Sequence, residues 1–164
     1  MNNSQTIDIL PIRAEHAAAV AQIIRQVGAE FGAVGEGFGP GDAEVAAMHR
    51  HYGRDDHSAY FIALLDGRVV GGGGIAPLDS SASLCELKKL FLLPEARGRG
   101  IGRALSERCL AFAREAGFRR CYLDTLASMT TAIALYRQLG FQPLDAPLGE
   151  SIHGGCDVWM LKQL

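Results

Sequence analysis

The segment LFLLPEARGRGIGRAL, residues 90–105, joins an apolar run to an amphipathic helix through a turn with alternating glycines. The apolar run stops at Pro94, and glycines then stand at positions 98, 100 and 102. Such small residues leave backbone N–H groups uncovered at a helix N-terminus, where the helix dipole is positive. Arg97, Arg99 and Arg103 add charge. The segment therefore predicts a site for a diphosphate, with a tight turn that needs glycine as the alternative.

The size and composition of the chain indicate one soluble globular domain, residues 1–164. The chain is 48% hydrophobic and 21% charged, which is ordinary for such a domain. The net charge of −2 argues against a nucleic-acid-binding surface, so the arginines near residue 100 are a local feature. No apolar run reaches the 18 residues that span a bilayer, so no membrane partner is expected.

The cysteines and the N-terminus favour a cytoplasmic location. Cys85, Cys109, Cys121 and Cys156 form no CxxC pair and lie in apolar segments, as reduced thiols do. The first eight residues lack the basic and apolar regions of a signal peptide.

Hydrophobic periodicity predicts an α/β fold. Strands are expected at 7–12, 58–65, 68–76, 84–93 and 119–125, with closing strands from 141 to 161, and helices at 15–27, 42–52, 102–116 and 130–139. Asp66-Gly67 is a strong hairpin signal. The strand–helix–strand order across residues 84–125 implies a parallel pair with a right-handed crossover. We therefore expect a mixed sheet with helices on both faces.

Two motifs resemble those of the GNAT superfamily of acetyl-CoA-dependent N-acetyltransferases. RGRGIG after LFLLP is similar to its pyrophosphate signature, [Q/R]xxGx[G/A], and LYRQLGF at 135–141 is similar to its second motif, LYxxxGF. The order of elements matches the GNAT fold from Ile7 to Leu161, so the resemblance covers nearly the whole chain. It implies a GNAT-like mixed sheet and transfer of an acetyl group from acetyl-CoA to an amine.

The resemblance also implies a set of cofactor-binding residues and no metal. Main-chain groups of Phe91, Leu92 and Leu93 would pair with the pantetheine arm of acetyl-CoA. The backbone amides that would hold its pyrophosphate, with Arg103 supplying further charge, are those of Arg97, Gly98, Arg99, Gly100, Ile101 and Gly102. Met129 stands where many members of the superfamily have an asparagine.

Tyr136 and Glu86 are the candidate catalytic residues. The tyrosine of the second motif protonates the departing thiolate in the family, and a phenol is a suitable donor for that step. Glu86 lies eleven positions before Arg97, where some members carry a general base. A core aromatic is the alternative for Tyr136, and an ion pair with Lys88 on the same strand face is the alternative for Glu86.

Weaker signals surround these two residues. Asp124 and Thr125 end a predicted strand and could contact substrate or cap a turn. The run Gly71–Gly74 predicts a bulge or a close approach of a ligand backbone. His49, His51 and His57 lack the spacing of metal ligands.

The sequence thus favours an N-acetyltransferase that acts by direct attack in a ternary complex. A non-catalytic acyl-CoA-binding or sensing module, and a different phosphate-ligand binder, are the alternatives. The acceptor would be a primary amine of a small molecule or peptide, whose identity the sequence leaves open. Homodimers are common for this fold, but no segment here specifies one.

Overall fold

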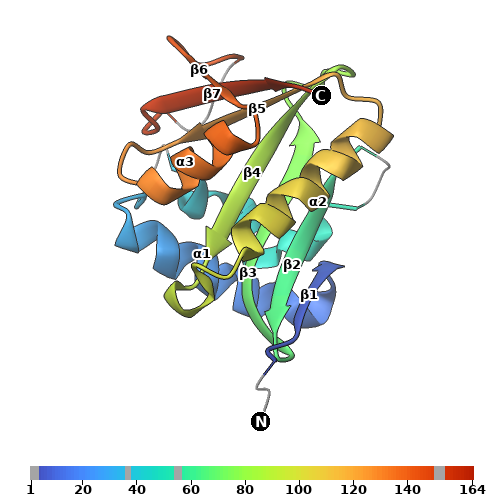
Figure 1. Cartoon of the computed structure of the whole chain (residues 1–164), viewed down its shortest axis with the longest axis vertical. Helices are drawn as coiled ribbons and strands as arrows, with labels where there is room; N and C mark the ends of the chain where they lie inside the picture. Colours follow the sequence, from blue (N-terminus) through green and yellow to red (C-terminus); the bar gives the residue numbers. More distant parts are fainter. Residues whose placement is uncertain (1–3, 36–37, 54–56, 150–153) are drawn as a thin grey trace.

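A computed structural model describes residues 4–35, 38–53, 57–149 and 154–164 and contains a seven-stranded mixed sheet (Figure 1). The strand order is β1-β2-β3-β4-β5-β7-β6, with β4 and β5 parallel and the other neighbours antiparallel. The strands are β1 (Ile7–Pro11), β2 (Ala59–Leu65), β3 (Arg68–Pro77), β4 (Leu84–Leu92), β5 (Arg120–Thr125), β6 (Gln142–Leu144) and β7 (Val158–Gln163). The predicted parallel pair and the predicted fold class are both confirmed.

Helices cover both faces of the sheet, as predicted. The helices are α1 (Ala17–Glu30), α2 (Ile101–Glu115) and α3 (Thr130–Gln138), and Figure 1 shows α2 in front of the sheet with α1 behind it. Neighbouring residues of β2 show the same division, because successive side chains of a strand point to opposite faces. Phe61 packs on Phe112 of α2, whereas Tyr60 packs on Tyr52 on the other face. No helix among the described residues is long and apolar enough to cross a membrane.

The helix predicted for residues 42–52 is a 3₁₀ segment, Ala43–Arg50, interrupted at Ala47. Val45 and Met48 are 1% and 0% exposed. The kink at Ala47 lies between these two residues, and both side chains are buried in the core on either side of it. Asp42 precedes the segment as predicted, but its carboxylate bonds Lys89 and makes no cap hydrogen bond. Tertiary contacts therefore override the helical pattern here.

The sheet divides between β4 and β5. Within the described residues these strands pair at three positions, and the last pair is Glu86 with Tyr122. Beyond it β4 continues to Leu92 and β5 to Thr125 without pairing to each other. The gap opens at the carboxyl ends of a parallel pair, where ligands bind in open α/β sheets.

A bulge in β4 follows this division. The register of β3 and β4 shifts between Gly72 and Gly74, and Lys89 of β4 has a φ of +51°. Tyr60 lies close over β3, because a Cβ at Gly72 would come within 2.6 Å of its ring. Its hydroxyl then donates to the Lys89 carbonyl at 2.8 Å. The predicted bulge is found opposite the glycine run, in β4, and the close neighbours of the glycines are side chains and backbone carbonyls of the protein itself.

Candidate active site

A cavity of about 440 Å³ lies between the β4–α2 turn and α3. Leu90 and Leu92 of β4 form one wall, and Val27 and Phe31 at the end of α1 form another. The turn contributes Gly98, Gly100, Ile101, Gly102 and the side chains of Arg97 and Arg103, and α3 contributes residues from Thr130 to Gln138. We call this cavity the donor groove.

The turn leaves its backbone uncovered toward the donor groove. Gly98 and Gly100 have φ values of +74° and +79°, which other residues adopt at a cost, and no atom lies within 4 Å of a Cβ built at either. Gly100 is the N-cap of α2, and no side chain caps the helix. The first N–H groups of a 15-residue helix are thus available to an anion, as the sequence predicts.

Arg97 ties the turn to the end of α1. Its guanidinium bonds both carboxylate oxygens of Glu30, with Nη1 to Oε1 at 3.1 Å, and donates to the Leu92 carbonyl at 3.0 Å. It also lies 5.2 Å from the centre of the Phe31 ring. The bond from Arg97, which outweighs the small desolvation cost, lowers the pKa of Glu30. Arg97 therefore fixes the groove wall.

The other two arginines of the turn occupy different places. Arg103 lines the groove and donates to Gln138 of α3 at 3.0 Å. Arg99 is turned toward the Glu95 carbonyl, at 2.9 Å, and toward Gln5. Of the two, Arg103 is the side chain that reaches the groove.

The three predicted pantetheine residues also differ. Leu92 lines the donor groove, and Phe91 lines the second cavity described below. Leu93 has its N–H bonded to Val70 and its carbonyl to Ala96, at 2.8 and 2.9 Å. Leu93 thus has its main chain engaged within the fold.

A smaller cavity of about 70 Å³ adjoins the donor groove, and we call it the acceptor pocket. Leu90 and Met129 line both spaces, so the two cavities share part of their walls. The pocket brings together residues that are far apart in sequence: Glu86 and Lys88 of β4, Asp124 and Thr125 of β5, Tyr136 of α3, and Cys156. Both predicted catalytic residues are therefore in one pocket.

Tyr136 is 5% exposed, and its ring packs edge-on to Phe141 with centroids 5.9 Å apart. Burial, with the nearby thiols of Cys109 and Cys121, raises the pKa of Tyr136 well above its ordinary value. The phenol therefore holds its proton at neutral pH. The ring of Tyr136 is packed in the core, and the residue also lines the pocket wall. A core aromatic and a proton donor, the two alternatives predicted for Tyr136, are therefore compatible.

Glu86 is 8% exposed and lies where β4 and β5 part. Lys88, its neighbour on the same strand face, forms an ion pair with Glu44, with Nζ 3.8 Å from Oε1. The carboxylate of Glu86 thus stands at the inner end of the gap.

The sequence did not single out Cys156 as a site residue. Burial, the charge of Asp124 and a hydrogen bond to that residue raise the pKa of Cys156 to about 12. A thiol becomes nucleophilic as its thiolate, so Cys156 is a neutral polar group here. Cys85, the residue beside Glu86, is 0% exposed and donates to the Arg120 carbonyl.

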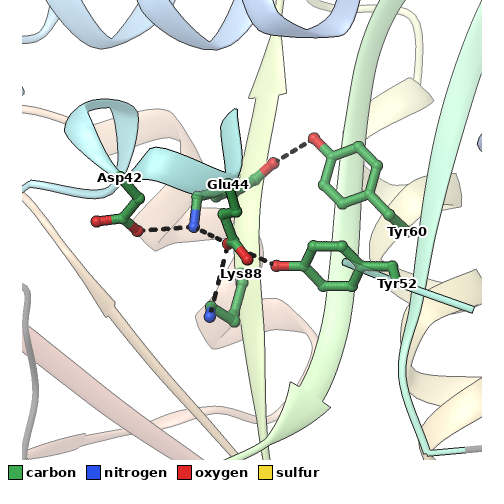
Figure 2. Close-up of polar contacts among 6 residues, drawn as sticks. Asp42, Glu44, Tyr52, Tyr60 and Lys88 are labelled. Carbon is green, nitrogen blue, oxygen red and sulfur yellow. Dashed lines mark hydrogen bonds and ion pairs between the residues drawn. The ribbon is translucent and has the colours of Figure 1, made fainter. Parts of the chain in front are cut away.

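A buried ionic cluster behind the pocket also escaped sequence reasoning. The side chain of Lys89 is 2% exposed and bonds Asp42 at 2.8 Å and Glu44 at shorter range. Tyr52 donates to Glu44 at 3.0 Å, as Figure 2 shows beside the Lys88 contact. Burial opposes ionisation of Glu44, but the lysine charges and these hydrogen bonds outweigh it and lower the pKa.

Comparison with known families identifies the fold and the chemistry. A model described as "Acetyltransferase (GNAT) family" matches residues 29–141, more than half of the chain. The chain belongs to the GNAT acetyltransferase family. Its GNAT membership makes it an acyltransferase, of the kind that uses acetyl-CoA as acetyl donor.

Individual GNAT relatives agree. The chain is 45% identical over 148 residues to the uncharacterised N-acetyltransferase YjgM of Escherichia coli, covering 89% of this chain and 88% of that protein. It is 44% identical over 82 residues to an IAA acetyltransferase of Azospirillum brasilense, covering 50% of this chain and 53% of that protein. The resemblance found in the two motifs is thus confirmed over most of the chain.

Solved GNAT structures share the fold. An acetyltransferase of the family from Staphylococcus aureus superposes with a TM-score of 0.81 at 18% identity, covering 96% of this chain and 99% of its own. YncA of Salmonella typhimurium, solved with acetyl-CoA, superposes with a TM-score of 0.76 at 17% identity. The match covers 96% of this chain and 94% of YncA. At these low sequence identities the superpositions show a shared fold and nothing about the roles of individual residues.

Proposed function

We propose that this protein transfers the acetyl group of acetyl-CoA to a primary amine of a small molecule or peptide, by direct attack in a ternary complex. The observation that carries the proposal is the contact between the two cavities. Leu90 and Met129 line both, so a donor in the groove and an amine in the pocket would meet across a shared wall. Holding two reactants at such a junction supplies much of the rate gain of a two-substrate enzyme.

In this proposal the β4–α2 turn binds the pyrophosphate of the donor. The backbone N–H groups of residues 98–102 and the charge of Arg103 are the binding groups, supported by the uncapped start of α2. The predicted contribution of the Arg97 N–H is wrong, because that group already donates to the Pro94 carbonyl at 3.2 Å. Main-chain groups of β4 from Phe91 onward take the pantetheine arm as an added strand would, since β5 does not pair with them. Leu93 contributes least to this pairing, because its N–H is bonded to Val70.

Glu86 and Tyr136 are assigned opposite proton transfers. The amine nitrogen attacks the thioester carbonyl carbon, and Glu86 accepts the proton that the nitrogen loses. The carbon–sulfur bond then breaks, and Tyr136 donates its proton to the departing thiolate. The raised pKa of Tyr136 supports the donor role, because the phenol is fully protonated at neutral pH. The raised pKa of Cys156 favours direct attack over an acyl-enzyme at that thiol.

The decisive experiment measures thiol release from acetyl-CoA across a panel of primary amines, together with equilibrium binding of CoA. Turnover that depends on the amine is expected. Tight CoA binding with no turnover for any amine would replace the proposal with an acyl-CoA-sensing module. Displacement of CoA by ATP in a thermal-shift assay would indicate a different phosphate ligand.

A further inference from the structure

The lysines in the wall of the acceptor pocket fall into two groups, those whose charge the fold already neutralises and those whose charge faces the pocket. Lys89 belongs to the first. Its ammonium is 2% exposed and is bonded by both Asp42 and Glu44, so its charge is balanced inside the protein. Lys89 therefore has little to offer a ligand, although it stands in the pocket wall.

Lys88 belongs to the second group. It lines the pocket and its side chain is 21% exposed. Its ion pair with Glu44 has Nζ 3.8 Å from Oε1, well beyond the roughly 2.8 Å of a charge-assisted hydrogen bond. The same oxygen already accepts from Lys89 and from Tyr52 (Figure 2). Lys88 thus retains donors that Glu44 does not satisfy.

Carboxylates stand near Lys88 in the same pocket. Glu86 lies two residues earlier on β4, so its side chain leaves the same face of the strand roughly 7 Å away. Asp124 faces the pocket from β5. The pocket wall therefore presents charges of both signs.

We propose that the acceptor is a small zwitterion, an amine that carries a carboxylate within a few bonds of its amino group, as a free amino acid does. Lys88 binds the carboxylate, and Glu86 and Asp124 attract the ammonium, which loses one proton to solvent before the amine attacks and a second to Glu86 as the amide forms. The small volume of the pocket, about 70 Å³, favours an acceptor whose two charged groups lie close together. A diamine would place a second cation beside Lys88, and a monoamine without a carboxylate would leave the donors of Lys88 without an anionic partner from the acceptor.

This inference rests on the proposed function and is tested with matched acceptors. Leucine, leucinamide and 3-methylbutylamine share a side chain and differ in the carboxylate. Rates are compared per total concentration of acceptor and over a range of pH, because the ammonium form is the one proposed to bind and the three amines differ in basicity. We expect kcat/KM for the best free amino acid to exceed that of its amide and its decarboxylated analogue at least tenfold. A decarboxylated amine or a diamine used equally well would overturn the proposal.

Variants at Lys88 provide the second arm. Lys88→Met should raise the acceptor KM at least tenfold and remove the preference for the carboxylate, with little change in kcat and in the KM for acetyl-CoA. Lys88→Arg keeps the charge and should retain the preference. A merely structural role would instead change the unfolding temperature or both substrates together. An unchanged acceptor KM in Lys88→Met would refute the assignment.

A binding measurement separates this inference from the proposed function. Calorimetric titration of free amino acids into the protein saturated with CoA reports on the Lys88 site without turnover. If no amine is acetylated but an amino acid binds the parent and not Lys88→Met, the proposed reaction fails and the anion site stands. If the parent binds no amino acid, the zwitterion proposal is wrong.

Discussion

Glu86 of β4 and Tyr122 of β5 are the last pair of residues that hold these two parallel strands in register. The candidate base is thus anchored on its paired side and faces the gap beyond it. A carboxylate held at this junction has its main chain fixed by the sheet, which is the rigid placement that proton transfer requires.

Tyr136→Phe should lower kcat by two orders of magnitude or more, since general acid catalysis contributes about 10²–10⁴-fold. The ring still packs on Phe141, so the unfolding temperature and the Kd for CoA should stay near those of the parent. Steady-state kinetics and calorimetric CoA binding check both. An unchanged kcat would remove the hydroxyl from the mechanism.

Glu86→Gln should lower kcat/KM for the acceptor and flatten the part of its pH profile that depends on the base. The amide keeps the shape of the side chain but cannot take a proton. Glu95→Gln is the matched control, because Glu95 is exposed and pairs with Arg68 away from the pocket. If the Glu86→Gln profile matched that of the parent, the base would have to be another group or water.

Gly102→Ala should separate ligand binding from stability. The position is helical, where alanine is favoured by up to about 1 kcal/mol, and the new Cβ would lie 3.3 Å from Leu92 Cδ1. We expect an unfolding free energy close to that of the parent and a weaker Kd for CoA, because the methyl group enters the groove. Gly100→Ala, at a φ of +79°, should instead lose about 1–2 kcal/mol of stability.

Lys89→Met should destabilise the fold by about 3 kcal/mol, because it leaves Asp42 and Glu44 facing an apolar side chain. Urea denaturation measures the change. Lys88→Met is the matched control at the adjacent position, and its ion pair at 3.8 Å predicts a small effect. If both variants lost the same unfolding free energy, the distinction between a neutralised Lys89 and a pocket-facing Lys88 would be contradicted.

Glu44 should make stability depend on acid pH. Its pKa in the folded state lies below its unfolded value, so its contribution is complete above that unfolded value and is lost as the pH falls through the folded pKa. Glu44→Gln should therefore weaken the fall in unfolding free energy between about pH 6 and pH 3. Denaturant titrations across that range test this, and a parent-like slope in the variant would exclude Glu44 as a source.

Local patterns predicted the elements that depend on nearby residues. Glycine is the residue that most easily adopts the positive φ of positions 98 and 100, so the sequence alone indicates a tight turn there. The turn and the uncapped start of α2 could therefore be predicted. The 3₁₀ segment Ala43–Arg50 could not, because it depends on burial of Val45 and Met48 and on the contacts of Lys89. Those contacts join residues more than forty positions apart, which periodicity does not detect.

In the candidate site, too, the residues that belong to a local motif were predicted, and those that depend on contacts between distant segments were not. Glu86 and Tyr136 were predicted through motif resemblance, and the structure places both in one pocket. Whether they act as base and acid stays a prediction. No local sequence signal pointed to Cys156 or to the unequal roles of Lys88 and Lys89. Two adjacent lysines are equivalent in the sequence, and they differ in the structure because Lys89, in the bulge of β4, has a φ of +51° and is buried.

The gap between β4 and β5 also bears on self-association. Unpaired strand edges invite other chains to add to a sheet. Here the outer edges are short strands with prolines, at Pro11 in β1 and Pro143 in β6. The unpaired groups of β4 instead face β5 inside the sheet. The fold thereby keeps hydrogen-bonding groups for a ligand in a place where an aggregating strand has no outer edge to join.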